Sequence, residues 1–403
     1  MAYKTFGIIL LALLAPFLYE RGQTLAIFYR NAPGRMVKID TFKSHEVKFA
    51  DRIRSCEDVL LVEDEGLALL ACDPGREKWN TVMGVFLPDP VSSGNLYVYN
   101  YKDTSASDDD DDDTLKKLEF IDFEHEADFH SLGMTYNETS STLLVANHRH
   151  DSPAIEMFKI DLKAYTATHV RSIQHPLIHG PNSLIWINEH EFYVTNNNHF
   201  LARDHPLLSK LEIYLGIPLG TVVHVDIAQE SPVANVVTRV PFANGIELLN
   251  STAAVVASSS KAKLYFFNID TTTTTTTTSQ SPPVFKHAFQ VSVGFMPDNL
   301  SLSKDGGLMI SGHPHMPTLV KFTQTRFVCN SPEELSKADE ATKEACRTLT
   351  APSWAARWTQ EGGVENLYAD DEYPSSATAV RDSDRRMGII SGLYAKGIFV
   401  WKE

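Results

Sequence analysis

The stretch Gly66–Asp73 reads GLALLACD, a short apolar run bounded by turn-forming residues. Runs of this kind recur along the chain at Gly66–Asp73, Thr142–His148, Glu191–Asn197, Thr252–Ser259, Gly307–His313 and Arg386–Leu393. They are rich in β-branched and aromatic residues and are bounded by Gly, Asn, Asp or Pro, which is typical of strands and turns. Self-similar units of several strands, repeated at roughly 40–80 residues, predict a β-propeller.

A third strand is expected after each of these runs. The third strands are expected at Leu96–Tyr101, Ile155–Asp161, Val222–Asp226, Leu264–Asp270, Leu319–Thr323 and Ile398–Lys402. Weaker fourth strands are expected at Leu118–Phe123, His169–Ile173, Val236–Val240, Phe285–Val291 and Val364–Tyr368. We therefore expect an all-β fold, a six-bladed β-propeller with four-stranded blades. The extended segment Met36–Phe49 is expected to complete the last blade and close the ring, which removes an open sheet edge.

The chain is expected to form one propeller domain over residues 36–403, with an insertion at residues 325–362 in blade five. Pro206–Gly216 has helical spacing of its apolar residues and predicts an amphipathic helix inserted in unit three. The aspartate run Asp108–Asp113 and the threonine run Thr271–Thr278 are expected to be loops.

Residues 1–30 contain the apolar stretch Phe6–Tyr19, which predicts an N-terminal apolar helix. The stretch matches the apolar region of a signal peptide and is shorter than the ~20 residues needed to span a bilayer. It is therefore either a cleaved signal or a retained membrane anchor. Both readings place the chain in the secretory pathway, as an extracellular or membrane-anchored protein.

The four cysteines fit an oxidising compartment. Cys56 and Cys72 fall opposite each other across the first predicted hairpin, and Cys329 and Cys346 flank a helix with an N-cap signal at Ser331. Two disulfides are therefore expected, and the alternative is four buried thiols.

Glycosylation sequons begin at Asn137 and Asn250, both in turns between first and second strands. The formal net charge of −15 argues against a nucleic-acid partner, because a phosphate backbone requires Lys and Arg to neutralise it.

In a propeller the innermost strands line a central channel, so their leading residues converge at one mouth. The leading pairs are Glu57-Asp58, His130-Ser131, Asn182-Ser183, Asn244-Gly245, Asp298-Asn299 and Ser375-Ser376. Asn and Asp also begin strands simply because they favour turns. Their recurrence at equivalent positions instead predicts a cation site. The carboxylates of Glu57 and Asp298 with the amides of Asn182, Asn244 and Asn299 form an all-oxygen set that suits Ca²⁺ better than Mg²⁺.

Several motifs occur in a fixed order along the chain. They are Glu57-Asp58, His130, Asn147-His148, Asn182, LEIYLG at 211–216, FANGI at Phe242–Ile246, PDNLS at Pro297–Ser301 and GHP at Gly312–Pro314. In these motifs, from about Phe42 to the C-terminus, the chain resembles the serum paraoxonase/arylesterase family of lactonases. Strictosidine synthase-like proteins and gluconolactonases share the architecture and match these motifs less well.

The resemblance implies a catalytic calcium ion bound by Glu57, Asn182, Asn244, Asp298 and Asn299, with His130 and His148 as the catalytic histidine pair. It also implies a second, structural calcium with Asp58 as one ligand. Ser183 stands where the family has another aspartate, so this second ion would have one carboxylate fewer. Several members retain the N-terminal apolar helix, which favours the anchor reading and a lipid-surface contact through this segment and the helix at 206–216.

The chemistry expected of such a site is hydrolysis of lactones and aryl esters. A calcium ion at the channel mouth would polarise a carbonyl oxygen, and a neutral imidazole nearby would take a proton from water. His130, which leads an inner strand, is the better candidate for the base, and His148 would orient it or relay the proton. His313 and His315 also border this end. The sequence lacks a G-x-S-x-G motif, which argues against a serine nucleophile. Two alternatives stay open: a calcium-stabilised propeller that binds a partner without catalysis, and another propeller enzyme of the strictosidine synthase-like or gluconolactonase type.

Overall fold

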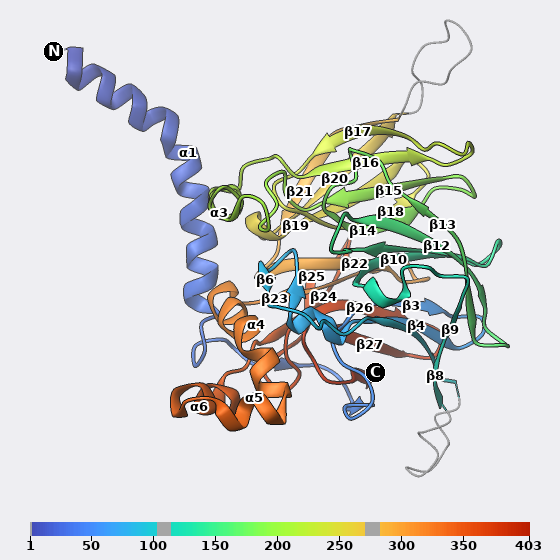
Figure 1. The fold of residues 1–403 in the computed structure, drawn as a ribbon. Helices are drawn as coiled ribbons and strands as arrows, with labels where there is room; N and C mark the ends of the chain where they lie inside the picture. Colours follow the sequence, from blue (N-terminus) through green and yellow to red (C-terminus); the bar gives the residue numbers. More distant parts are fainter. Residues whose placement is uncertain (1, 103–113, 271–282) are drawn as a thin grey trace, which may run out of the picture.

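Six sheets built mainly of antiparallel strands form the blades of a β-propeller (Figure 1). Each innermost strand contacts the innermost strands of the two neighbouring blades, which closes the ring. The computed structural model describes residues 2–102, 114–270 and 283–403, without the side chains of residues 2–13. The runs Asp108–Asp113 and Thr271–Thr278 lie outside the described residues.

The strands follow one another outward from the channel in each blade. The innermost strands are β3 (Cys56–Val62), β10 (Ser131–Asn137), β14 (Pro181–Trp186), β18 (Ala243–Asn250), β22 (Met296–Leu302) and β26 (Ser376–Asp382). The second strands are β4 (Leu67–Cys72), β11 (Thr142–Asn147), β15 (Glu191–Asn196), β19 (Ala253–Ser258), β23 (Leu308–His313) and β27 (Met387–Gly392). The third strands are β7 (Asn95–Asn100), β12 (Ala154–Asp161), β16 (Thr221–Asp226), β20 (Lys263–Asp270), β24 (Ser353–Thr359) and β28 (Ile398–Lys402). The outermost strands are β8 (Leu115–Lys117), β13 (Thr166–Ile173), β17 (Val233–Arg239), β21 (Val284–Ser292), β25 (Gly363–Asp370) and β2 (Ser44–Lys48).

The ring closes as expected from the segment Met36–Phe49. Its strand β2 pairs antiparallel with β28, the last strand of the chain, with Ser44 opposite Lys402. The short strand β1 (Ile39–Asp40) pairs with β25 and adds a fifth strand to blade five. The two ends of the propeller domain are thus paired in blade six, the N-terminal segment also joins blade five, and a sheet edge is covered.

Apolar layers fill the space between adjacent blades. Leu69 and Leu70 on β4 show why the runs are continuously apolar: Leu69 packs toward blade two and Leu70 toward blade six. Successive side chains of a strand point to opposite faces, so a blade buried on both faces requires apolar residues at consecutive positions.

Buried polar side chains join the innermost strands of neighbouring blades. Asp58 Oδ2 on β3 accepts a hydrogen bond from the backbone N–H of Met134 on β10 at 2.8 Å. Asp58 Oδ1 accepts another from Thr378 Oγ1 on β26 at 2.9 Å. Ser183 Oγ on β14 accepts a third from the backbone N–H of Ile246 on β18 at 3.4 Å. The channel wall is therefore bonded laterally as well as along each blade.

The helices gather on one face of the propeller (Figure 1). They are α1 (Ala2–Arg30), α3 (Pro206–Leu215), α4 (Met316–Asn330), α5 (Pro332–Lys337) and α6 (Glu340–Thr348). The helix α3 is the one expected between the second and third strands of unit three, and Gly216 caps its C-terminus in the left-handed conformation. Ser331 caps α5 by accepting a hydrogen bond from the backbone N–H of Glu334, as its sequence indicates.

The N-terminal helix α1 docks on blade four through charged groups. Glu20 forms ion pairs with Lys261 and Lys263 at 2.5 and 2.9 Å. Arg21 Nη1 donates a hydrogen bond to the carbonyl of Ser260 at 2.9 Å. Among the described residues, none of the helices combines the length and apolarity required to cross a bilayer.

The prediction of the third strand in blade five is wrong. Leu319–Thr323 belongs to α4, where Leu319 and Phe322 are buried on one helical face against Leu393 and Tyr394. The third strand of blade five is instead β24, which falls inside the predicted insertion 325–362, and the helices occupy residues 316–348.

The fourth strand predicted at Leu118–Phe123 is also misplaced. Blade one ends in β8, and the following strand β9 (Glu119–Ile121) pairs in parallel with β13 of blade two. The predicted run thus holds a strand of blade two, and the fourth strand of blade one lies just before it.

Both disulfides form, between Cys56 and Cys72 and between Cys329 and Cys346. Cys56 and Cys72 are paired residues of the first hairpin, as predicted. The second bridge joins α4 to α6 and ties the helical insertion together.

Candidate functional site

A register break interrupts the innermost hairpin of every blade near the same end of the channel. The breaks lie between Cys56 and Asp58, Ser131 and Met134, Pro181 and Leu184, Ala243 and Ile246, Pro297 and Leu300, and Ser376 and Thr378. A β-bulge of this kind bends the strand and redirects side chains away from the regular alternation. Four of the six bulges hold the residues predicted to bind a cation.

The bulge residues Glu57 and Asn299 are in direct contact. Asn299 Nδ2 donates to Glu57 Oε1 at 2.9 Å and to Thr378 Oγ1 at 2.9 Å. Glu57, Asn299 and Thr378 are all buried. The amide is thereby oriented with both of its donors used, which leaves its carbonyl oxygen free to bind another group.

Four oxygens of the predicted ligands are buried without a hydrogen-bond partner among the residues that the structure describes. They are Glu57 Oε2, Asn182 Oδ1, Asn244 Oδ1 and Asn299 Oδ1. Burying such an oxygen without a partner costs about 1–3 kcal/mol, so four of them in one channel require an explanation. For Asn244, the amide nitrogen is fixed by a 2.9 Å hydrogen bond to Ser259 Oγ, so its oxygen is the unsatisfied end.

The carboxylates at this mouth repel one another. Burial raises the pKa of Glu57 well above its usual range, and the nearby charges of Asp58 and Asp298 raise it further. Burial also raises the pKa of Asp58 to about 6. Buried like charges of this kind are stable only when a cation or a proton neutralises them.

Asp298 pairs with a histidine. His313 Nε2 lies 2.9 Å from Asp298 Oδ2, and both side chains are buried. His313 Nδ1 has no partner within the described part of the chain. The pair therefore leaves a buried imidazole nitrogen, His313 Nδ1, on a side chain that contacts a predicted cation ligand.

Asp58 differs from the other predicted ligands because its oxygens are already bonded. Oδ1 accepts from the backbone N–H of Val59 and from Thr378 Oγ1, both at 2.9 Å, and Oδ2 accepts from Met134. Ser183, which replaces the expected second aspartate, bonds to Ile246. These contacts hold the inner strands together and do not require a second ion.

His130 is held by a buried carboxylate. Its Nδ1 lies 3.2 Å from Asp73 Oδ2, and both side chains are almost completely buried. A carboxylate can only accept a hydrogen bond, so Nδ1 carries the ring proton and Nε2 is left with a free lone pair. Within the described residues, Nε2 makes no hydrogen bond.

His148 has both ring nitrogens engaged. Nδ1 lies 2.5 Å from Thr81 Oγ1, and Nε2 lies 2.5 Å from the carbonyl of Pro181. Burial lowers the pKa of His148 to about 4, so the ring is neutral at pH 7. Pro181 immediately precedes Asn182, and the bond from His148 therefore fixes the strand that carries this predicted ligand.

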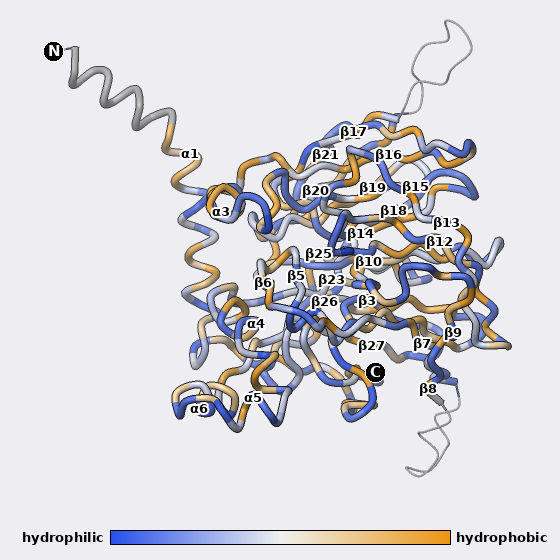
Figure 2. Tube along the Cα trace, viewed as in Figure 1, coloured by the Kyte–Doolittle hydropathy of each residue, from blue (hydrophilic) through white to orange (hydrophobic). Residues whose placement is uncertain are grey.

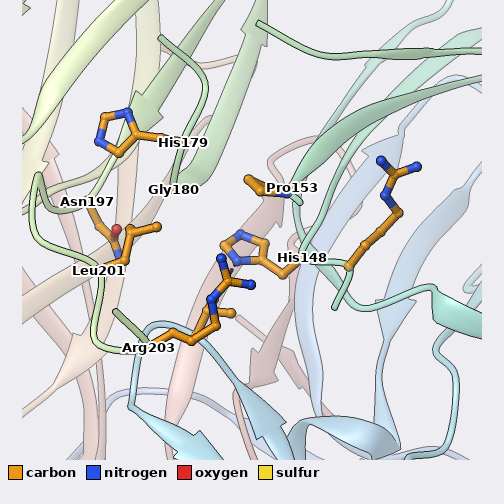
Figure 3. A pocket seen from close by; sticks show the side chains of 9 residues that line it. His148, Pro153, His179, Gly180, Asn197, Leu201 and Arg203 are labelled. Atoms are coloured by element: carbon orange, nitrogen blue, oxygen red, sulfur yellow. Dashed lines mark hydrogen bonds between the residues drawn. The ribbon is translucent and has the colours of Figure 1, made fainter. Parts of the chain in front are cut away.

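His148 also borders a small pocket with Asn197, Leu201 and Arg203 (Figure 3). Its volume of about 20 Å³ has room for roughly one water molecule and excludes an organic substrate.

A larger apolar cavity of about 340 Å³ lies between the channel mouth and the helices. It is lined by Phe17, Leu18, Arg21, Thr24, Leu25 and Phe28 of α1, Ile213, Tyr214 and Leu215 of α3, and Phe242, Ser259, Ser260, Met296 and Met316. Figure 2 shows hydrophobic residues along the described part of α1 beside α3. Ser259 bonds to Asn244, so the cavity reaches the predicted cation ligands.

Two of the expected leading positions are not equivalent to the others. In blades two and six the bulge positions are Leu132-Gly133 and Ala377, whose side chains cannot bind a cation. His130 precedes strand β10 and therefore lies outside the bulge of blade two.

Sequence reasoning missed Asp73, Ser259 and Thr378, the polar partners of the site residues. Ser259 and Asp73 follow the second strands β19 and β4 directly, and this position could have marked them. Thr378 lies inside strand β26 after Ala377, and no comparable position in the sequence marks it.

The chain matches the arylesterase family over residues 83–347. It is 32% identical over 114 residues to human "Serum paraoxonase/arylesterase 1", which covers 28% of this chain and 30% of the relative. It is 23% identical over 222 residues to rabbit "Serum paraoxonase/lactonase 3", covering 54% of this chain and 57% of the relative. The matched regions thus span less than two thirds of these relatives.

The fold is similar to that of a solved "Luciferin-regenerating enzyme", with a TM-score of 0.50 at 9% identity, covering 89% of this chain and 95% of that chain. This likeness concerns the fold alone. The match over residues 83–347 makes this chain, folded as a β-propeller, a member of the arylesterase family.

Proposed function

We propose that the chain is a calcium-dependent hydrolase of lactones and aryl esters. The observation that carries this proposal is the group of four buried oxygens, contributed by four different blades, that have no hydrogen-bond partner in the described part of the chain. Carboxylate and amide oxygens of this kind are the ligands that Ca²⁺ prefers.

Glu57, Asn182, Asn244, Asp298 and Asn299 would hold the ion. When bound, Ca²⁺ supplies a positive charge that polarises a carbonyl oxygen. The remaining functions fall to the protein. Asn299 and Ser259 orient the ligand oxygens through their hydrogen bonds to Glu57 and Asn244.

His130 acts as the general base in this proposal. Asp73 holds its Nδ1 proton, and Nε2 accepts a proton from the attacking water. The imidazolium that forms is stabilised by the buried Asp73 carboxylate. His148, with both nitrogens bonded, is a positioning residue for Asn182 rather than a proton carrier.

His313 is a second imidazole with an open nitrogen, and Asp298 orients it in the same manner. Its direct bond to a proposed calcium ligand assigns it to ligand positioning. Comparison of variants at His130 and His313 distinguishes the two roles.

The apolar cavity accommodates the substrate's hydrocarbon part in this proposal. Its lining is mainly apolar side chains of α1 and α3, and it also includes Met296 and Ser259, which bonds to the proposed ligand Asn244. An acyl chain or an aryl ring of a small-molecule lactone or ester suits such a lining.

The disulfides and the family support a place in the secretory pathway, extracellular or membrane-anchored, and residues 1–30 would serve as the signal or anchor segment ahead of the propeller domain at 36–403. Exposed apolar side chains on α1 and α3, including Tyr19, Leu25 and Leu207, support contact with a lipid surface. Asn137 and Asn250 end two innermost strands and are proposed glycosylation sites on the face opposite the cation ligands.

The test is turnover of a panel of lactones and aryl esters before and after chelation, with product analysis. We expect hydrolysis that chelation abolishes and added Ca²⁺ restores. Full turnover in chelator would contradict the calcium requirement. Calcium binding without turnover of any substrate would favour a non-catalytic binding propeller, and products other than hydrolysed esters or lactones would favour a different propeller enzyme.

A further inference from the structure

Two histidines and an aspartate meet beside the channel mouth, outside the proposed calcium ligands. Asp128 ends the short 3₁₀ helix η3 (Glu126–Asp128), His130 precedes β10, and His150 follows β11. His150 Nδ1 lies 2.5 Å from Asp128 Oδ1, and His130 Nε2 lies 3.5 Å from the same oxygen. One ligand atom from each residue thus falls within 4.8 Å of the others.

The buried member of this cluster has an unsatisfied lone pair. Asp73 holds the ring proton of His130 on Nδ1, so Nε2 carries no proton. Nε2 and the Asp128 oxygen that it faces are therefore both hydrogen-bond acceptors, with no proton between them. No donor from the described residues reaches Nε2, and the His130 side chain is only 2% exposed. A bound cation would satisfy both atoms at once.

The surroundings resemble the support that metal-binding histidines receive. A ligating histidine usually donates its second N–H to a carboxylate, which is the relation between His130 and Asp73. Trp79 stacks on His150 with a centroid distance of 4.0 Å and holds this ring in place. The Asp128 carboxylate also accepts from the backbone N–H of His150 at 3.0 Å.

We propose that Asp128, His130 and His150 bind a divalent transition-metal ion, Zn²⁺. Two imidazoles and one carboxylate are ligands that Zn²⁺ accepts, at about 2.0–2.2 Å each. The ion takes the place of the proton on His150 Nδ1, this proton moves to Nε2 of the same ring by exchange with solvent, and His150 Nδ1 moves slightly away from Asp128 Oδ1. Asp128 and His150 are 31% and 38% exposed at their side chains, so the ion enters from solvent and keeps an open coordination position.

This site goes beyond the proposed function, because it requires neither calcium nor hydrolysis. It has one consequence that rests on the proposed function. An ion on His130 Nε2 occupies the lone pair of the proposed base, so Zn²⁺ inhibits hydrolysis by the parent and has a weaker effect on His150→Ala.

The test is a titration of the full chain with Co²⁺ in excess Ca²⁺, monitored by visible absorption. Ca²⁺ is silent in this measurement and keeps the channel ligands occupied. We expect a visible band that saturates at a single ion per chain and is removed by Zn²⁺. His150→Ala and Asp128→Asn weaken Co²⁺ binding at least tenfold, and Asp73→Asn weakens it by about 10–100-fold.

His287→Ala, at an exposed histidine on β21, is the matched control and leaves the band unchanged. Absence of the band in the parent, or unchanged Co²⁺ affinity in His150→Ala, would overturn the proposal. Because His150 is partly exposed, its variant is expected to fold, and circular dichroism verifies this. Hydrolysis is not part of the measurement, so failure here and failure of the proposed function are separable.

Discussion

Asn299 Nδ2 donates a hydrogen bond to Glu57 Oε1 at 2.9 Å and joins blade five to blade one across the inner wall of blade six. Thr378 of blade six accepts a second bond from the same nitrogen. The remaining oxygens, Glu57 Oε2 and Asn299 Oδ1, find no partner among the described residues. Three blades therefore cooperate to leave two oxygens unsatisfied, which is the expected arrangement of a binding site and not of a structural core.

Glu57→Gln is expected to stabilise the calcium-free protein at neutral pH while abolishing its activity. Gln keeps the acceptor for Asn299 and removes a carboxyl group whose ionisation is unfavourable at this buried position, so the expected gain is about 1–3 kcal/mol of unfolding free energy. Thermal melts of both proteins in chelator measure the difference.

The pH dependence of this gain follows from the raised pKa of Glu57. Below the unfolded pKa of about 4.3 the carboxyl is protonated in both states, so its ionisation costs nothing. As the pH rises from the unfolded pKa toward the folded pKa, the Glu57 carboxyl ionises in the unfolded state only. The free energy of unfolding of the parent protein therefore falls relative to that of Glu57→Gln. A variant that is less stable than the parent at pH 8, or a gain that does not vary with pH, would contradict this account.

His130→Gln is expected to lower kcat by about 10²–10⁴-fold with little change in calcium affinity, because it removes the base and leaves the ligands. His313→Gln and His148→Gln are expected to weaken calcium binding, through Asp298 and through Pro181 next to Asn182. Calcium titrations together with kcat separate the two classes. Loss of calcium binding in His130→Gln, with normal binding in His313→Gln, would reverse the assignment.

The two disulfides are expected to differ in their effect on stability. Replacing Cys56 and Cys72 by Ser removes a bridge in the core of the first blade, at a cost of about 3 kcal/mol. Replacing Cys329 and Cys346 loosens α4 and α6, which lie outside the blades, and leaves the main unfolding transition within about 1 kcal/mol of the parent. Thermal unfolding reports the first effect, and limited proteolysis between residues 316 and 348 reports the second. Equal losses of stability from both pairs would be inconsistent with this division.

Phe28→Ala is expected to raise KM for esters with long apolar acyl chains about tenfold and to leave small substrates unaffected. Phe28 lines the apolar cavity, and truncating it removes apolar contact worth roughly 1–3 kcal/mol. Leu207→Ala on α3 is the matched control, because Leu207 is 70% exposed and does not line the cavity. An equal rise of KM in both variants would place the substrate elsewhere.

The strand pattern could be predicted from sequence because a blade buried on both faces requires consecutive apolar residues, as at Leu69 and Leu70. The same rule failed at Leu319 and Phe322, since a short apolar run fits a buried helical face as well as a strand. The closing strand β2 could be predicted because the last blade lacked a fourth strand, whereas the extra strand β1 carries too few residues to leave a pattern. Strand β9 lies within the predicted run Leu118–Phe123, but its pairing with blade two could not be predicted from a single sequence.

The candidate site was predicted from sequence as a set of polar residues at equivalent positions, but the arrangement of these residues in the structure could not be predicted in this way. The bulges that redirect Glu57, Asn182, Asn244, Asp298 and Asn299 depend on pairing between strands, which a single sequence does not display. The position of His130 relative to Asp73 and Asp128 likewise depends on segments that are distant in sequence.

The central claim is that the channel oxygens bind calcium, and calcium titration of metal-free protein by calorimetry tests it most directly. We predict a saturable site in the parent that Glu57→Gln and Asn244→Ala both lose, with hydrolysis returning in proportion to the calcium bound. A parent that binds no calcium, or variants that bind it as the parent does, would contradict the account.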